Sequence, residues 1–250
     1  PGMDEKEKGA FAQKHFNANV EKGGKVFLAR NWLSAIAYFE RALVLMDLLP
    51  DKSAAPKIYK ILAQAAYNHE DYKKAIRYQL ELVSLAEKMN NPEALAEAVY
   101  FLGILYSRAE DYPKAVENLR KSLAIYQKNE ILDKLAESYS ALGIVEENAL
   151  DYDKALEAFN ASLKINSEIG EDLNKGRELR RIGRIYYLRL GNYGAAQKYF
   201  SEANELFKKL KQTEQVVETL LELGLVAEKT GNFPQALKFY QSAQSLSDTQ

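Results

Sequence analysis

The sequence contains no cysteine and only two histidines in 250 residues, and these absences exclude several classes of site. Without cysteine there is no disulfide, no thiolate zinc site and no cysteine nucleophile. His15 and His69 lie far apart and have no acidic or histidine partner at metal-ligand spacing. Because there is also no Gly-rich phosphate loop after a strand and no recognisable nucleophile, we expect no metal, no cofactor and no enzymatic activity.

Long apolar runs and an excess of charge are missing too. No stretch of about 18 apolar residues occurs, so we expect no membrane insertion. The formal net charge of −1 gives no reason to expect nucleic acid as the partner. The polar start is no signal peptide, and Pro1-Gly2 before Met3 is typical of a cloning remnant. We therefore expect a cytoplasmic protein by default, with a trimmed export signal as the alternative.

The residues that are abundant favour helices. Hydrophobic residues make up 47% and charged residues 28%, which is typical of a folded globular chain. Ala, Leu, Glu and Lys dominate and are good helix formers, whereas short Val/Ile/Thr-rich runs with Asn-Gly turns are absent. The composition predicts an all-α fold.

A short phrase recurs along the chain: Asp or Asn, then an aromatic residue, then Ala three positions later. The aromatic residues stand at regular intervals of 40 or 41 positions: Trp32, Tyr72, Tyr112, Tyr152, Tyr193 and Phe233. The preceding Asp or Asn is suited to cap a helix, so we expect a second helix of each repeat, helix B, to begin there. The capping residues are Asn31, Asp71, Asp111, Asp151, Asn192 and Asn232.

A small residue lies nine or ten positions before each aromatic residue, inside an apolar run. It is Gly23, Ala63, Gly103, Gly143, Gly183 or Gly224, depending on the repeat. Glycine in mid-helix costs about 1 kcal/mol relative to alanine, so its repeated use indicates a close approach of the first helix, helix A, to another element. We expect the alanine of helix B to form the opposing surface, as Ala155 does for Gly143.

These spacings resemble the tetratricopeptide repeat family, because Leu102-Gly103, Tyr106 and Ala115 match its Leu-Gly, Tyr and Ala positions. The repeat resembles the long subclass, of about 40 residues, found in signalling scaffolds and bacterial peptide sensors. The resemblance implies an all-α, right-handed superhelical solenoid of six antiparallel helix-turn-helix repeats. We expect residues 1–9 to form a tag remnant and N-terminal tail, and residues 10–250 a single domain. Its repeats span approximately residues 10–50, 51–91, 92–130, 131–170, 171–212 and 213–250.

The family resemblance also assigns one stripe of each helix A to a concave, partner-binding groove. Arg177, Arg180 and Arg184 share such a stripe, at spacing i, i+3, i+7. We expect them to recognise acidic groups, assisted by Tyr187 and, from the preceding repeat, by Ser140 and Asn148. The alternative is that they pair with acidic residues of adjacent repeats: Glu137, Glu147 or Glu218. The other expected groove residues are Lys57, Lys60, Gln64, Tyr67, Asn68, Tyr100 and Arg108.

These observations predict a non-enzymatic scaffold or adaptor. We expect its groove to bind a peptide or protein segment that carries acidic groups. The chain is expected to be monomeric or weakly self-associating. The alternative is a regulatory or sensor segment of a larger signalling protein or enzyme whose effector domain lies outside this chain.

Overall fold

The structure, a computed structural model, describes residues 4–248, and within that range it contains twelve α-helices and no strand. The predicted all-α fold is confirmed. The helices are α1 (Glu5–Leu28), α2 (Trp32–Met46), α3 (Ala55–Asn68), α4 (Tyr72–Lys88), α5 (Pro92–Arg108), α6 (Tyr112–Lys128), α7 (Leu132–Asn148), α8 (Tyr152–Glu168), α9 (Asp172–Leu188), α10 (Tyr193–Lys209), α11 (Thr213–Lys229) and α12 (Phe233–Ser247).

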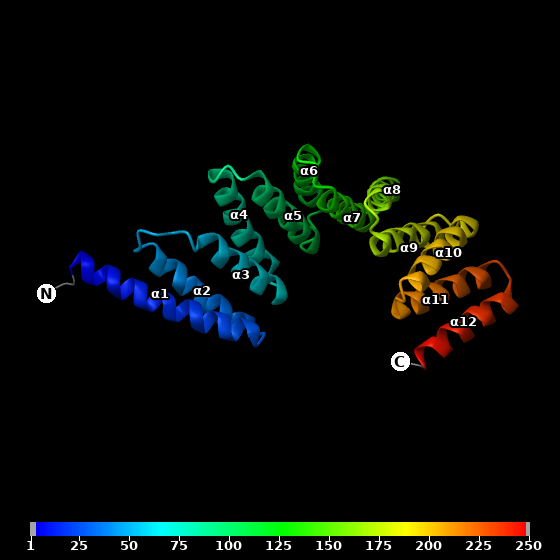
Figure 1. The fold of residues 1–250 in the computed structure, drawn as a ribbon, viewed down its shortest axis with the longest axis horizontal. Coiled ribbons are helices and arrows are strands. Elements are labelled where there is room, and N and C mark those ends of the chain that lie inside the picture. The colour runs from blue at the N-terminus through cyan, green and yellow to red at the C-terminus, as the bar shows by residue number, and fades with distance from the viewer. Residues whose placement is uncertain (1–3, 249–250) are drawn as a thin grey trace. The chain divides into compact units, whose positions relative to one another are not determined.

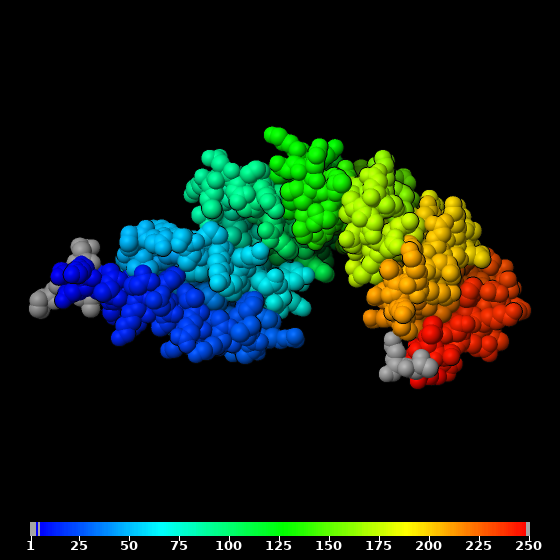
Figure 2. All heavy atoms as spheres, viewed as in Figure 1, coloured from blue at the N-terminus to red at the C-terminus, as the bar shows by residue number. Residues whose placement is uncertain are grey.

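The helices belong to two compact units, one that ends at Ile125 and one that begins at Tyr126, so the division falls within α6. Inside each unit, helices that follow one another along the chain pack as antiparallel pairs, such as α1 with α2 and α7 with α8 (Figure 1). Side chains fill the spaces between the ribbons of such neighbours (Figure 2). The predicted hairpins are therefore present, and each unit is described by itself below.

The predicted capping residues all cap the helix that they precede. Asp71 Oδ1 accepts a hydrogen bond from the Lys74 amide at 3.0 Å, and Asn192 Oδ1 accepts one from the Ala195 amide at 3.0 Å. The residue before the cap has a positive φ, for example 62° at Glu70. This conformation lets the Asp71 amide donate to the Ala66 carbonyl oxygen, which satisfies a carbonyl at the end of the preceding helix. The recurring phrase thus ends one helix and begins the next.

The fifth repeat contains one additional residue, and the turn after α9 accommodates it. The Asn192 amide donates to the Tyr186 carbonyl oxygen, six residues back, whereas Asp71 reaches back five residues to Ala66. Gly191 provides the positive φ, 61°, that this turn requires. The extra residue is therefore confined to the turn and leaves the start of α10 in register with the other helices B.

The small residues of helix A do mark close approaches, but the expected opposing surface was wrong. A Cβ atom added at Gly143 would lie 2.5 Å from the Phe159 ring, and one at Gly183 would lie 2.8 Å from the Phe200 ring. These rings stand one turn beyond the alanine of helix B. An atom of the helix B alanine is among the three nearest only at Gly103, where the Ala115 carbonyl oxygen lies at 3.1 Å. Each of these glycines leaves space for a large side chain of helix B.

The first helix is longer than the sequence indicated. It begins at Glu5, inside the segment expected to be a tail, because Asp4 and Glu7 form a reciprocal capping box. Pro1, Gly2 and Met3 lie outside the described residues, and so does the expected tag remnant. Across residues 4–248, none of the helices has the length and apolarity that a bilayer span requires. The same residues contain no group of three or more His, Asp or Glu side chains suited to a metal ion.

Candidate functional site

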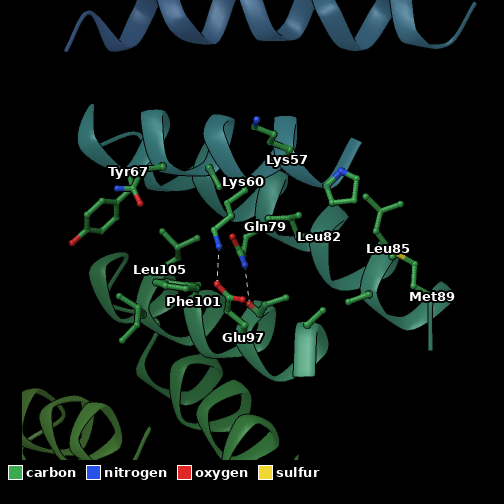
Figure 3. Close-up of a pocket in the computed structure, with 17 residues that line it drawn as sticks. Lys57, Lys60, Tyr67, Gln79, Leu82, Leu85, Met89, Glu97, Phe101 and Leu105 are labelled. Atoms are coloured by element: carbon green, nitrogen blue, oxygen red, sulfur yellow. Dashed lines mark hydrogen bonds and ion pairs between the residues drawn. The ribbon is translucent and has the colours of Figure 1, made fainter. Parts of the chain in front are cut away.

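A concavity of about 480 Å³, called here the α3–α5 hollow, lies between α3 and α5 with α4 as its floor. Most of its lining is apolar. In Figure 3, Tyr67 lies at one end and Leu85 and Met89 at the other. The side chains that line it are Pro56, Lys57, Lys60, Ala63, Gln64, Tyr67, Gln79, Leu82, Leu85, Ala86, Met89, Ala94, Glu97, Ala98, Phe101, Ile104 and Leu105.

The hollow coincides with two differences in the second repeat, an amide and a small side chain where most other repeats carry larger apolar ones. Gln79 stands where the other helices B carry Phe39, Leu119, Phe159, Phe200 and Tyr240. Ala86 stands where they carry Met46, Tyr126, Asn166, Phe207 and Ser247. In the fifth repeat, Phe207 is fully buried and its ring would meet a Cβ at Gly176 at 2.7 Å. The equivalent positions in the second repeat, Ala86 and Pro56, both line the hollow.

One ion pair joins the two walls of the hollow. Lys60 Nζ of α3 lies 2.7 Å from Glu97 Oε1 of α5, midway between Tyr67 and Met89 (Figure 3). Both side chains are largely exposed, at 64% and 49%. An exposed pair of this kind contributes about 0–1 kcal/mol, because water screens both charges. The two charges can therefore separate at little cost.

The structure brings four of the expected groove residues of the first unit to the hollow: Lys57, Lys60, Gln64 and Tyr67. Asn68 lies beside them, because its Oδ1 accepts a hydrogen bond from Gln64 Nε2 at 3.0 Å. Tyr100 does not line the hollow, and its ring packs edge-on against Phe101 at 5.3 Å. Arg108 is exposed at the last position of α5.

In the second unit, the central arginine of the expected stripe is already engaged. Arg180 Nε donates to Glu222 Oε2 at 2.8 Å, and its Nη1 contacts Glu218, both on α11. Arg184 Nε lies 3.9 Å from Glu222 Oε1. Burial lowers and these carboxylates raise the pKa of Arg180, with a net increase. The contact with Glu218 is one that the pairing alternative anticipated, and an anion-binding role for the stripe stays a prediction.

The remaining expected residues of that unit have other neighbours. Arg177 Nη1 donates to Asn174 Oδ1 on its own helix at 3.2 Å. Ser140 Oγ accepts a hydrogen bond at 2.6 Å from Arg181, which is not part of the stripe. The Tyr187 ring packs against Tyr193 at 5.7 Å, and Asn148 is exposed at the end of α7. None of these contacts joins Ser140 or Tyr187 to the arginine stripe.

The floor of the hollow was not predicted from the sequence, because the groove residues were expected on helix A alone. Gln79, Leu82, Ala86 and Met89 come from α4 and its C-cap. A signal was present: aligning the six helices B shows an amide and a small side chain where the other repeats mostly have larger apolar ones. The pattern could have suggested a packing defect, but not whether neighbouring helices close over it.

Comparison with known proteins agrees with the repeat pattern. The tetratricopeptide repeat profile matches residues 55–128, 95–168, 134–209 and 177–248. No curated protein sequence matches the chain significantly.

Solved structures with the same fold share little sequence identity with this chain. BtubC (BKLC) from P. vanneervenii has a TM-score of 0.70 at 17% identity, over 99% of this chain and 92% of that one. The putative kinesin light chain repeats from Podosopora anserina have a TM-score of 0.67 at 15% identity, over 80% of this chain and 98% of that one. The quorum sensor NprR from B. thuringiensis has a TM-score of 0.69 at 14% identity, over 94% of this chain and 65% of that one.

Proposed function

This chain belongs to the tetratricopeptide repeat family, and on that basis we propose that it is a non-enzymatic scaffold that holds a segment of a partner protein in the α3–α5 hollow. The single observation that carries the proposal is the hollow itself. Its volume of about 480 Å³ and its largely apolar lining are typical of ligand sites, which hold a few polar groups among apolar walls.

The exposed apolar side chains of the hollow supply the driving force. Phe101 is 42% exposed and Met89 is 63% exposed, although both border a concave surface. Apolar side chains of a partner that enter the hollow would remove this area from water, at about 25 cal/mol per Å² buried. In the fifth repeat the equivalent volume is filled by the buried Phe207 side chain, which lies close to Gly176.

A second candidate is that the chain acts as the sensor module of a longer protein. The observation in its favour is that NprR, described as a quorum sensor, has the same fold and is only 65% covered by this chain. In that case the hollow would still bind the segment, and binding would be transmitted to an effector region. Both candidate functions therefore require the hollow to bind a peptide segment.

The experiment is a selection from a random peptide library, followed by affinity measurements on the enriched peptides as fluorescent conjugates. Ala86→Phe fills the hollow from its floor and Ala94→Phe from the α5 wall, and Ala37→Phe adds the same ring at an exposed position of α2. We expect both filled variants to weaken binding by about a hundredfold or more, since loss of an apolar anchor costs about 3 kcal/mol. The Ala37→Phe protein should bind as the wild type does.

Thermal melts establish that each filled variant is folded. Because the two substitutions lie on different helices, one poorly tolerated substitution does not decide the outcome. The proposal fails if no peptide is enriched, or if enriched peptides bind both folded, filled variants as tightly as the wild type.

A further inference from the structure

The floor of the hollow presents one oriented hydrogen-bond acceptor. Gln79 is only 5% exposed, and its Nε2 donates to the Ala98 carbonyl oxygen of α5 at 2.9 Å (Figure 3). This bond identifies the nitrogen and the oxygen of the Gln79 amide, because only the nitrogen can donate to a carbonyl. The Gln79 carbonyl oxygen must therefore lie on the side of the amide away from Ala98.

That oxygen accepts no hydrogen bond from any side chain or backbone group among residues 4–248. It is nevertheless not one of the fully enclosed side-chain atoms without a hydrogen-bond partner that residues 4–248 contain, which are Glu178 Oε2 and Asn204 Oδ1. A donor that enters the hollow can reach it. Since the other repeats carry an aromatic ring or leucine at this position, the fold does not need an amide here.

We infer, on the basis of the proposed function, that the α3–α5 hollow takes an extended peptide segment, one backbone N–H of which donates to Gln79 Oε1. An extended chain has free backbone N–H groups, whereas a helical ligand uses its own internally. From Gln79 to Met89 the floor advances ten residues along α4 and its C-cap, which corresponds to about 15 Å. About five extended residues cover that length, with alternate side chains pointing into the hollow.

The charges at the rim indicate an acidic residue in the segment. Lys57 is exposed and forms no ion pair with the described residues of the chain. The charge of Lys60 is balanced by Glu97, so the rim carries one positive charge in excess. The segment thus combines apolar residues at alternate positions with a carboxylate placed to reach Lys57. A basic segment would be repelled.

The test uses synthetic versions of the peptides most enriched in the selection. Each backbone nitrogen in turn is methylated, which removes its N–H, and each peptide is measured against the wild type and Gln79→Leu. In the wild type, methylation at one position should weaken binding about tenfold. In Gln79→Leu the same methylation should have little further effect, since its acceptor is gone. This coupling separates a contact with the peptide from the structural bond to Ala98.

Lys57→Met provides the second arm and Lys73→Met, on the exposed start of α4, its matched control. An acidic peptide should bind Lys57→Met several-fold more weakly, and added salt should reduce the difference. The inference is overturned if N-methylation does not weaken the binding of peptides that fail to bind the filled variants. It is also overturned if the effects of methylation and of Gln79→Leu are additive, or if the enriched peptides are basic. In those cases the hollow still binds peptide and the proposed function stands; loss of all binding to the hollow defeats both.

Discussion

The two units place a cation and an acid at the same register of successive helices A, with different results. In the first unit, Lys60 and Glu97 form a single exposed pair above an apolar hollow. In the second, Arg180 occupies the position of Lys60 and Glu218 that of Glu97, and Glu222 adds a second carboxylate. The side chains of Arg180 and Glu222 are only 23% and 16% exposed.

The same charge pattern therefore gives a partly buried cluster in one unit and an exposed ion pair in the other. The planar guanidinium of Arg180 holds two carboxylates of α11 in a partly buried cluster, where charge-assisted hydrogen bonds are strong. The ammonium of Lys60 holds one carboxylate, and water screens the pair. In the sequence the arginines therefore resemble the stronger binding site, whereas in the structure the Lys60–Glu97 pair lies beside the more accessible apolar surface.

The largest difference between the units should appear in their tolerance of added volume. Gly143→Leu in the second unit should lower the free energy of unfolding by about 3 kcal/mol, because even a Cβ there would lie 2.5 Å from the Phe159 ring. Ala63→Leu, the matched change in the first unit, should cost less than about 1 kcal/mol, because its added atoms enter the hollow. Chemical denaturation measures both values. Equal losses would mean that the hollow offers no usable space.

The second-largest difference between the units should be in the stability that their ion pairs contribute. Arg180→Ala leaves the partly buried Glu222 without its principal partner, so we expect a loss of about 2 kcal/mol in the free energy of unfolding. Lys60→Ala, its counterpart, should cost less than about 1 kcal/mol. Thermal and denaturant unfolding of the two variants decide the matter. If Arg180→Ala unfolds like the wild type and instead loses an acidic peptide, the arginine stripe is a binding site after all.

The smallest expected difference is in how stability depends on pH. It arises at equivalent positions of helix A, which hold Ala98 in the first unit and Glu178 in the second. Burial raises the pKa of the Glu178 carboxyl above its ordinary value of 4.5, and the opposing effects of Arg181 and Ser140 do not cancel it. The native state therefore retains this proton to higher pH than the unfolded chain does. The stability contributed by Glu178 should fall as the pH rises from 4.5 through its pKa in the folded protein.

Melting temperatures of the wild type and Glu178→Gln, measured from pH 4.5 to pH 7, test this expectation. The wild type should lose stability relative to the variant over that interval. A difference that stays constant with pH, or one that favours the wild type more at pH 7, would show that Arg181 keeps the carboxylate ionised throughout.

Much of the fold followed from the sequence because its causes are local. Asp71 and Asn192 cap helices through bonds to residues three positions away, so their spacing alone located the turns. The close approach at Gly143 was also correctly indicated, but its partner was not. The ring of Phe159 belongs to a different helix, and the sequence does not state which residue of that helix faces the glycine.

For the candidate site, the sequence determined which residues face outward from helix A, including Lys57, Lys60, Gln64 and Tyr67. Only the tertiary structure decided that Arg180 is engaged by Glu218 and Glu222 and that Gln79 and Ala86 leave a hollow. The physical reason is that helical periodicity fixes the direction of a side chain relative to its own helix. Whether that side chain meets an opposite charge, a close-packed ring or open space depends on helices some 40 residues away.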